Sequence, residues 1–294
     1  MMLSIAVAAK GTCDPGAFIE ALMREYALTS SDIDVHIAHD EDWPAEYRNL
    51  DDAITLHRCV EGTSVLRLWG TAIANSQGEY IAVLDVCSPP ETGWLKCVQL
   101  QIEHRTPLFF GPVEPGWGKN DARIVGYLAE YAQFSKPLAS TLEEVPGNNI
   151  VCHRSLLDDA SGLVSEGFFK TFMVWRLEQE ESLKPQKCED MAVIYYKPFS
   201  RKHYMMKRYL HGRCFGVTRH DNTGQPPRSL CMISTLVLPI IRIWRIYRAV
   251  KKHSDLRYAF FRFFHLIVQS EIAWSYGEMA GYINRDRSVC AQLD

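Results

Sequence analysis

The sequence lacks the short signatures of several common protein classes. No GxGxxG or GxxxxGK(S/T) segment follows its first apolar stretch, which argues against a dinucleotide-dependent oxidoreductase and a P-loop ATPase. Its nine cysteines are an odd number, widely scattered and without a CxxC pair. We therefore expect neither a disulfide framework nor a structural zinc site, and a reducing cytoplasmic setting.

Long apolar runs are also missing. The chain begins with MMLSIAVAAKG, whose apolar run is too short for a signal peptide and has no basic start, so we predict a core strand over Leu3–Ala9. Leu230–Ile241 is largely apolar but contains Pro239. A helix of that length cannot cross the roughly 30 Å of hydrocarbon in a bilayer.

Charge is distributed unevenly along the chain. Residues 1–103 hold 6 Lys and Arg against 16 Asp and Glu, whereas residues 207–262 hold 12 against 2. A basic, aromatic-rich half fits an anionic membrane surface, a phosphate-bearing substrate or nucleic acid. Because no nucleic-acid-binding motif is present, we expect no nucleic-acid partner.

The first hundred residues alternate between patterns typical of strands and helices. Such alternation predicts a mostly parallel sheet flanked by helices. We expect strands over Leu3–Ala9, Ile33–Ala38, Ala53–His57 and Tyr80–Leu84, and helices over Ala17–Tyr26, Val65–Ala74 and Trp94–Ile102. Further along, we expect a strand over Leu108–Phe110, a helix over Tyr127–Phe134 and a strand over Met191–Tyr196.

A lone acid ends the central strand. We expect the preceding helix to end in a left-handed cap at Gly78, and Tyr80–Leu84 then leads to Asp85. The segment Ser88-Pro89-Pro90 must leave the sheet, so Asp85 stands at the carboxyl end of a core strand, where open α/β sheets bind ligands. Asp85 is either a functional carboxylate or an ordinary strand end solvated by water.

This stretch, with GEYIAVLD followed by a proline-containing turn and GWL, resembles the centre of the inverting family-two glycosyltransferases of the GT-A type. The resemblance implies a GT-A domain over residues 1 to about 220, followed by a helical module over 221–294. It also implies transfer of a sugar, with inversion, from a nucleotide-sugar donor such as a UDP-sugar to a lipid-linked or polysaccharide acceptor. The family carries two or three acids at its metal motif, and here only Asp85 remains before Val86 and Cys87.

Three further positions match the family's donor site. Asp40 follows the second strand, where the family places an acid on the uracil or ribose of the donor. Arg67 resembles an arginine near the donor diphosphate, and Asn149 in VPGNNI resembles a segment between donor and acceptor. The alternatives are a solvated acidic turn at Asp40, an ordinary surface arginine at Arg67 and a turn capped by Asn149.

An inverting transfer needs a carboxylate that takes the proton of the acceptor hydroxyl. Where the family has this acid, the chain has Lys170. Glu166 lies one helical turn before Lys170 and Glu178 about two turns after it, so these two glutamates are the candidate bases.

A basic cluster matches another part of the family. Arg208, His211 and Arg213 lie in RKHYMMKRYLHGRCFG, which resembles a helix and loop that can neutralise the leaving diphosphate. The alternative is a basic amphipathic helix that faces lipid or solvent. This cluster leaves the cofactor open: either Asp85 holds a weakly bound Mg²⁺ or Mn²⁺, or catalysis is metal-independent. We favour metal-independent catalysis.

The C-terminal quarter is aromatic, aliphatic and cationic. It predicts interfacial helices attracted to an anionic membrane surface, with packing on the catalytic domain or a second subunit as the alternative. WSYGEMAGY resembles the tail of bacterial membrane-associated glycosyltransferases. We therefore predict a peripheral protein on the inner face of the cell membrane. A non-catalytic, glycosyltransferase-like scaffold is the alternative function.

Overall fold

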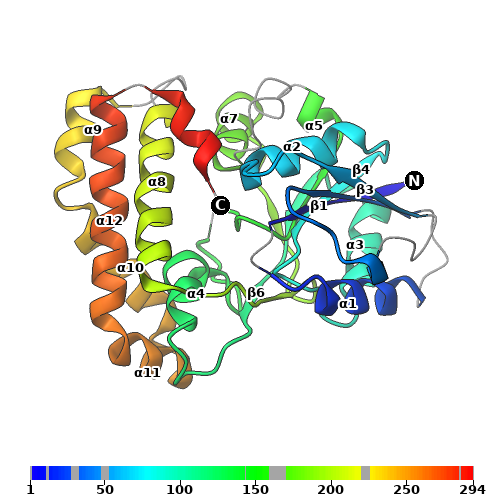
Figure 1. The fold of residues 1–294 in the computed structure, drawn as a ribbon, viewed down its shortest axis with the longest axis horizontal. Helices are drawn as coiled ribbons and strands as arrows, with labels where there is room; N and C mark the ends of the chain where they lie inside the picture. Colours follow the sequence, from blue (N-terminus) through cyan, green and yellow to red (C-terminus); the bar gives the residue numbers. More distant parts are fainter. Residues whose placement is uncertain are drawn as a thin grey trace. The chain divides into compact units, whose positions relative to one another are not determined.

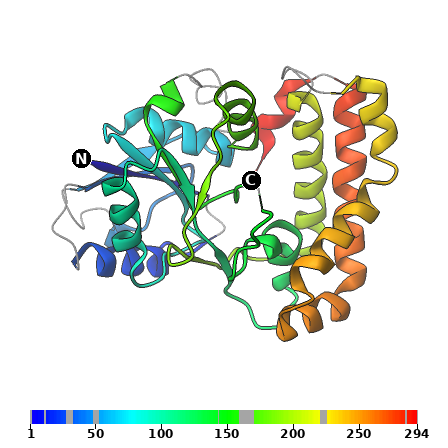
Figure 2. The same cartoon turned by 180° about the vertical axis from the view of Figure 1, so that it is seen from behind.

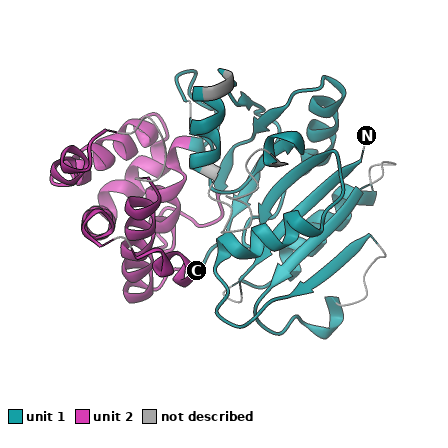
Figure 3. Cartoon of the chain, turned by 90° about the horizontal axis from the view of Figure 1, so that it is seen from above, with its two compact units in different colours: residues 1–114, 134–197 teal, residues 115–133, 198–294 magenta. Residues whose placement is uncertain are grey.

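The computed structural model describes residues 2–10, 13–27, 33–47, 53–142, 144–158, 170–219, 226–284 and 286–293. The chain forms two compact units, shown in different colours in Figure 3. The sheet unit comprises residues 1–114 and 134–197, and the helical unit comprises residues 115–133 and 198–294. The observed units meet at residues 114/115, 133/134 and 197/198, whereas the predicted domain boundary lies near residue 220.

The sheet unit is built on a seven-stranded sheet with the order β3-β2-β1-β4-β7-β5-β8. Four neighbouring strands are parallel, namely β1 (Leu3–Ala9), β2 (Ile33–His39), β3 (Ile54–Arg58) and β4 (Tyr80–Asp85). Antiparallel β7 (Ile150–His153) separates β4 from β5 (Leu108–Phe110), and β8 (Gln186–Lys187) is parallel to β5. The predicted α/β class with a mostly parallel sheet is confirmed.

Helices cover both faces of this sheet. Helices α1 (Gly16–Ala27) and α3 (Trp94–Glu103) lie on one face, and α2 (Val65–Asn75) lies on the other (Figure 1). Every residue of β1 and β4 is buried, as expected for parallel strands covered on both sides. This unit also contains α5 (Ser155–Asp158) and α7 (Lys170–Glu181).

The direction of the strands determines where the chain can bind a ligand. Strands β1, β2 and β4 are parallel, and β5 runs the same way as β4 because both are antiparallel to β7. All four therefore end at one edge of the sheet, which we call the carboxyl edge. Ligands of open α/β sheets bind at such an edge.

Glycine 78 has a different role from the one predicted. Helix α2 ends at Asn75 with Ser76 as its C-cap, so the expected left-handed cap at Gly78 is wrong. The backbone N–H of Gly78 instead donates to Ser4 Oγ over 2.7 Å, and a Cβ at this position would meet the backbone of Ser4. Gly78 thus allows the close approach of two chain segments.

The helical unit is organised around two long helices. Helices α8 (Arg201–Arg219) and α12 (Phe264–Ile283) lie side by side in Figures 1 and 2. Each carries two glycines four residues apart that face the backbone of the other helix, namely Gly212 and Gly216 on α8 and Gly277 and Gly281 on α12. The missing side chains let the two backbones approach closely.

Shorter helices complete this unit. They are α4 (Ile124–Glu130), α9 (Arg228–Ser234), α10 (Leu238–Val250), α11 (Ser254–Arg262) and the 3-10 helices η2 (Ala132–Phe134) and η3 (Arg287–Gln292), although η2 ends within the sheet unit. The sheet unit also has the 3-10 helix η1 (Ala45–Tyr47), and β6 (Val113–Pro115) pairs with β9 (Val193–Tyr195) in a second, two-stranded sheet.

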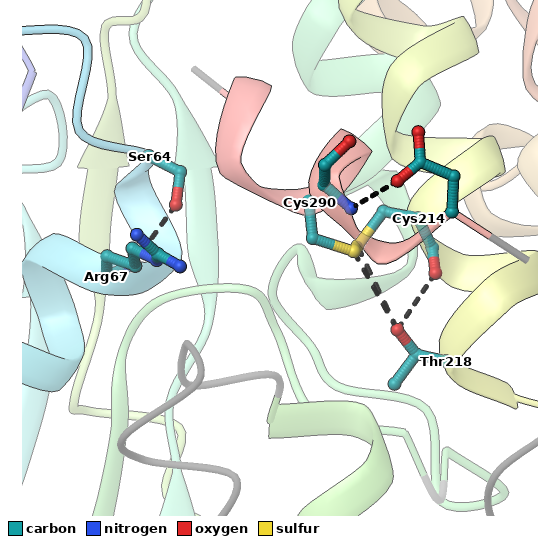
Figure 4. Close-up of a disulfide and its surroundings, with 7 residues drawn as sticks. Ser64, Arg67, Cys214, Thr218 and Cys290 are labelled. Atoms are coloured by element: carbon teal, nitrogen blue, oxygen red, sulfur yellow. Dashed lines mark hydrogen bonds between the residues drawn. A yellow bond between two sulfur atoms is a disulfide. The ribbon is translucent and has the colours of Figure 1, made fainter.

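Two disulfides overturn the expectation that the cysteines remain unpaired. Cys13 after β1 is bonded to Cys87 after β4, with their Cα atoms 5.5 Å apart. Cys214 on α8 is bonded to Cys290 on η3, and the Thr218 hydroxyl donates to the carbonyl of Cys214 over 2.9 Å (Figure 4). The partners are 74 and 76 residues apart, so they meet only after folding and leave no local sequence signature.

Candidate functional site

Asp40 is a buried carboxylate at the carboxyl edge, directly after β2. Its Oδ2 accepts from Lys10 Nζ over 2.6 Å and from the backbone N–H of Gly62 over 3.2 Å. Lys10 follows β1 and also donates to the carbonyl of Thr63 over 2.9 Å. The lysine fixes one carboxylate oxygen and aligns the group. The sequence analysis did not select Lys10, although its place one residue after a core strand was a usable signal.

The second oxygen of Asp40 is available for a ligand. Asp40 is 4% exposed, and within the described part of the chain its buried Oδ1 has no hydrogen-bond partner. Leaving a buried acceptor unpaired costs about 1–3 kcal/mol. A hydroxyl or N–H donor from a ligand would remove that cost.

Two histidines lie on the strands beside Asp40. The rings of His36 on β2 and His57 on β3 are stacked with centroids 5.2 Å apart, and their Nδ1 and Nε2 atoms are 2.9 Å apart. Burial lowers the pKa of His57, and His36 and His39 lower it further. His57 is therefore neutral at neutral pH and adds no positive charge to this side of the site.

Asp85 ends β4 and faces the same edge. It is 9% exposed, and its Oδ1 accepts from the backbone N–H of Cys87 over 2.8 Å. Its Oδ2 makes no hydrogen bond among the described residues and can bind a cation. Within the described ranges no group of three His, Cys, Asp or Glu side chains is arranged to hold a metal ion. The residues therefore fit a hard cation only if phosphate and water supply most of its ligands.

Arg67 lies near the start of α2, and its side chain is exposed. Its backbone N–H donates to Ser64 Oγ over 3.4 Å, which caps the helix (Figure 4). In the described structure, no carboxylate pairs with its guanidinium. Arg67 thus keeps its full hydrogen-bonding capacity for an anion such as a diphosphate.

Asn149 has a different role from the predicted donor contact. It is fully buried with φ 61°, its Oδ1 accepts from Trp94 Nε1 over 2.8 Å, and its Nδ2 donates to the carbonyls of Pro112 and Met191. These bonds hold three segments together and leave the amide inaccessible to a donor. The structural alternative, an asparagine that stabilises a turn, is the one observed.

The neighbouring Asn148 is the better candidate. Its Nδ2 donates to Ser88 Oγ over 2.6 Å, and its Oδ1 is buried without a partner among the described residues. Ser88 lies three residues after Asp85. The VPGNNI motif therefore indicated the right segment. The sequence alone does not reveal that the side chains of the two adjacent asparagines have different partners.

Of the two predicted bases, the structure describes only Glu178. Glu166 lies outside the described residues. Glu178 lies on α7, with Oε1 3.9 Å from Lys184 Nζ and a side chain that is 41% exposed. The assignment of either glutamate as the base stays a prediction.

Glu114 is a carboxylate that the sequence analysis missed. It lies on β6, which follows β5 in the chain, and its Oε1 accepts from the backbone N–H of Lys136 over 2.7 Å. Burial raises the pKa of Glu114, and Glu91 and Glu189 add to the rise against the opposing effect of Lys136. A partly buried carboxylate with a raised pKa suits a general base.

Arg208 belongs to a buried ion-pair network in the helical unit. It is 2% exposed, and its Nη2 donates to Glu271 Oε1 over 2.9 Å. Arg242 binds the other oxygen of Glu271, and both guanidinium groups stack on Trp274, with centroid distances of 4.5 and 4.6 Å. Arg208 thus neutralises a buried acid, which differs from the predicted contact with a diphosphate.

The other two members of the basic cluster have separate neighbours. The ring of His211 lies edge-on to Trp274 at 6.3 Å. Arg213 Nη2 is 3.7 Å from Asp286 Oδ2, and the side chain is 22% exposed. Binding of the donor by His211 and Arg213 stays a prediction.

Comparison with known proteins supports the fold. No protein-family model and no curated protein sequence matches the chain. The structure is similar to that of the mannosyltransferase PcManGT from Pyrobaculum calidifontis in complex with GDP-Man and Mn²⁺, with a TM-score of 0.54 and 14% identity over 93% of this chain and 86% of that one. It also resembles S. aureus TarS 1–349 in complex with UDP-GlcNAc, with a TM-score of 0.49 and 12% identity over 95% and 90%. The similarity to PcManGT shows that the chain shares the fold of that mannosyltransferase.

Proposed function

We propose that this protein is a glycosyltransferase that takes a sugar from a nucleotide-sugar donor and transfers it with inversion. The observation that carries the proposal is the carboxyl edge of the sheet, where Asp85 ends β4 and Asp40, held by Lys10, has a buried carboxylate oxygen without a partner among the described residues. A relative in fold, PcManGT, binds GDP-Man and Mn²⁺. A UDP-sugar remains the donor that we propose, from the resemblance of the sequence.

Each part of the donor has a matching residue in this proposal. Asp40 binds the nucleoside, Arg67 binds the diphosphate, and Asp85 would contribute one carboxylate ligand to a hard divalent cation. A bound Mg²⁺ or Mn²⁺ would neutralise the charge on the leaving diphosphate. The metal-independent route that we favoured from the sequence relies on Arg208, His211 and Arg213. Because Arg208 is committed to Glu271, we propose the metal-assisted route.

Asp40→Ala should weaken binding of a uridine nucleotide by about 1–3 kcal/mol, because a buried hydrogen-bond partner is lost. Isothermal titration calorimetry measures this directly. Asp42→Ala is the matched control, since that nearby carboxylate is 80% exposed and pairs with the exposed Arg58. Equal affinities for the two variants would remove Asp40 from the nucleotide site.

Glu114 is the base that we propose in place of Glu166 and Glu178. Since burial raises the pKa of Glu114, its ionised form accumulates at higher pH than that of an ordinary carboxyl group. The transfer rate should therefore rise with pH through the pKa of Glu114, and Glu114→Gln should abolish that rise. A pH–rate profile of Glu114→Gln that keeps the wild-type shape would return the role to Glu178 or Glu166.

The acceptor that we propose is lipid-linked or a polysaccharide, and the proposed site of action is the inner face of a cell membrane. The basic and aromatic composition of residues 207–262 supports this part of the proposal. The second candidate function is a non-catalytic scaffold, which the single acid at the end of β4 favours. A thermal-shift screen of nucleotide sugars tests donor binding, which the transferase requires.

A further inference from the structure

The helical unit exposes a continuous stretch of large apolar side chains on α9 to α11. The first part, which we call the apolar ridge, runs through the end of α9 and along the outer side of α10. Its members are Leu230, Ile233, Leu236, Val237, Ile240, Ile241, Trp244 and Tyr247, each between 37% and 71% exposed. Three more exposed aromatic side chains lie on α11 and at the start of α12, namely Tyr258, Phe261 and Phe264. Large apolar side chains that gather exposed on one surface mark interaction sites.

The ridge has the dimensions of a segment that enters a bilayer without crossing it. In the described part of the chain no single helix is long and apolar enough to span a membrane. Helices α9 and α10 reach that length and apolar composition only when taken together, and the pair is bent by 62°. Helix α10 has 13 residues. At 1.5 Å per residue it is about 20 Å long, which is short of the roughly 30 Å hydrocarbon core.

Cations accompany the ridge, and the chain itself does not neutralise them. Five exposed cations on α10, on α11 and between them have no carboxylate within ion-pair distance among the described residues: Arg248, Lys251, Lys252, Arg257 and Arg262. This contrasts with Arg208 and Arg242, which both form ion pairs with Glu271. Exposed cations beside exposed aromatic groups are the composition of a helix at an anionic interface.

A groove on α11 is lined by two of these cations, Arg257 and Arg262. It is lined by Ser254, Arg257, Tyr258, Phe261 and Arg262, which recur on one side of the helix. Arg257 Nη1 makes only a long bond of 3.3 Å to the carbonyl of Lys251, and Arg262 stacks 5.5 Å from the ring of Phe263. Both guanidinium groups keep donors for phosphate oxygens, and the two aromatic rings offer an apolar floor.

We propose that the helical unit docks on one leaflet of an anionic phospholipid bilayer, with the apolar ridge in the hydrocarbon and lipid phosphates bound by Arg257 and Arg262 in the α11 groove. This deepens the proposed function, on whose membrane location it rests. A second copy of the chain is a poorer occupant, because a symmetric contact would place the unpaired cations of both copies together. The lipid phosphate supplies the missing negative charge.

The test uses the full-length protein and flotation with phosphatidylcholine vesicles that contain or lack phosphatidylglycerol. Binding should require phosphatidylglycerol at low salt and should persist in part at about 1 M salt, where electrostatic attraction is screened within about 3 Å. Arg257→Gln with Arg262→Gln should weaken binding about 30-fold, as expected for two basic residues near an anionic surface. Ile240→Asp should abolish the binding that persists at high salt. Val60→Asp, on the sheet unit, should change neither the binding at low salt nor the binding at high salt.

Brominated lipids add a measurement of depth. They should quench the fluorescence of the wild-type protein more than that of Trp244→Phe if Trp244 enters the hydrocarbon. Failure of the wild-type protein to float at low salt would overturn the proposal, as would flotation that is unaffected both by Ile240→Asp and by Arg257→Gln with Arg262→Gln. Light scattering that shows a dimer converted to a monomer by Ile240→Asp would also overturn it and assign the face to a second copy. Nucleotide binding is measured on the same samples, so failure of docking is distinguished from failure of the transferase proposal.

Discussion

Replacing Glu271 with glutamine is expected to destabilise the helical unit by about 3–5 kcal/mol, which is the usual effect of breaking a buried ion pair. Glu271 is fully buried and is the partner of both Arg208 and Arg242. Without the carboxylate, the buried guanidinium of Arg208 would lose its hydrogen-bonded ion-pair partner and would keep only the weaker attraction of Glu130. Differential scanning calorimetry should show a lower melting temperature.

The matched control for this prediction is Asp255→Asn. Asp255 forms an ion pair with Lys119 in the same unit, but both side chains are largely exposed. Exposed pairs contribute about 0–1 kcal/mol, so the control should unfold almost like the wild-type protein. An equally small effect of Glu271→Gln would contradict the account of the network.

The same network predicts how stability depends on acid. Burial alone would raise the pKa of Glu271, but Arg242 and Arg208 together outweigh it and hold the pKa below its usual value near 4.5. A carboxyl group whose folded-state pKa is lowered stabilises the fold above its unfolded pKa. This contribution should be complete above the usual value and lost as pH falls through the folded-state pKa. Glu271→Gln should show a smaller loss of stability in that range.

Asp85→Asn is expected to slow sugar transfer by about 100-fold or more, the scale found when one group that stabilises charge in the transition state is removed. Asp85 is the only acid at the end of β4, and its amide replacement would keep the shape while losing the charge that would attract a cation. Glu79→Gln is the matched control, because Glu79 precedes the opposite end of the same strand. Its transfer rate should match that of the wild-type enzyme.

Chelation separates the two cofactor hypotheses. With excess chelator, the metal-assisted route predicts loss of transfer and recovery when Mn²⁺ is added. Full activity in chelator, together with a normal rate for Asp85→Asn, would contradict the metal-assisted route. It would indicate that basic side chains such as His211 and Arg213 neutralise the leaving diphosphate. The comparison needs no assumption about the acceptor, since hydrolysis of the donor can be followed as well.

The sequence was most informative where a local pattern determines the outcome. The buried apolar runs predicted β1 with its observed ends and β4 to within one residue, because such strands are covered on both faces. The alternation of strand and helix then placed Asp40 and Asp85 at one edge. Lys10 escaped notice because a single lysine after a strand is ordinary until Asp40 is seen 2.6 Å away.

Long-range partners could not be predicted from the sequence. Arg208 and Glu271 are 63 positions apart, and Cys13 is 74 positions from Cys87. Nothing in a basic helix reveals that one arginine faces inward toward an acid on another helix. The glycines of α8 and α12 were noted only as part of a resemblance, whereas their physical role is to let two helix backbones meet.

The central claim is that the carboxyl edge of this sheet turns over a nucleotide sugar, and one measurement tests it most directly. The protein is incubated with a panel of nucleotide sugars and Mn²⁺, and released nucleoside diphosphate is quantified for the wild-type protein and for Asp85→Asn. The account predicts release from at least one donor, most strongly a UDP-sugar, and about 100-fold less release from the variant. A wild-type protein that binds a donor but releases no nucleoside diphosphate, with or without a glycan or lipid acceptor, would contradict the claim and support the scaffold.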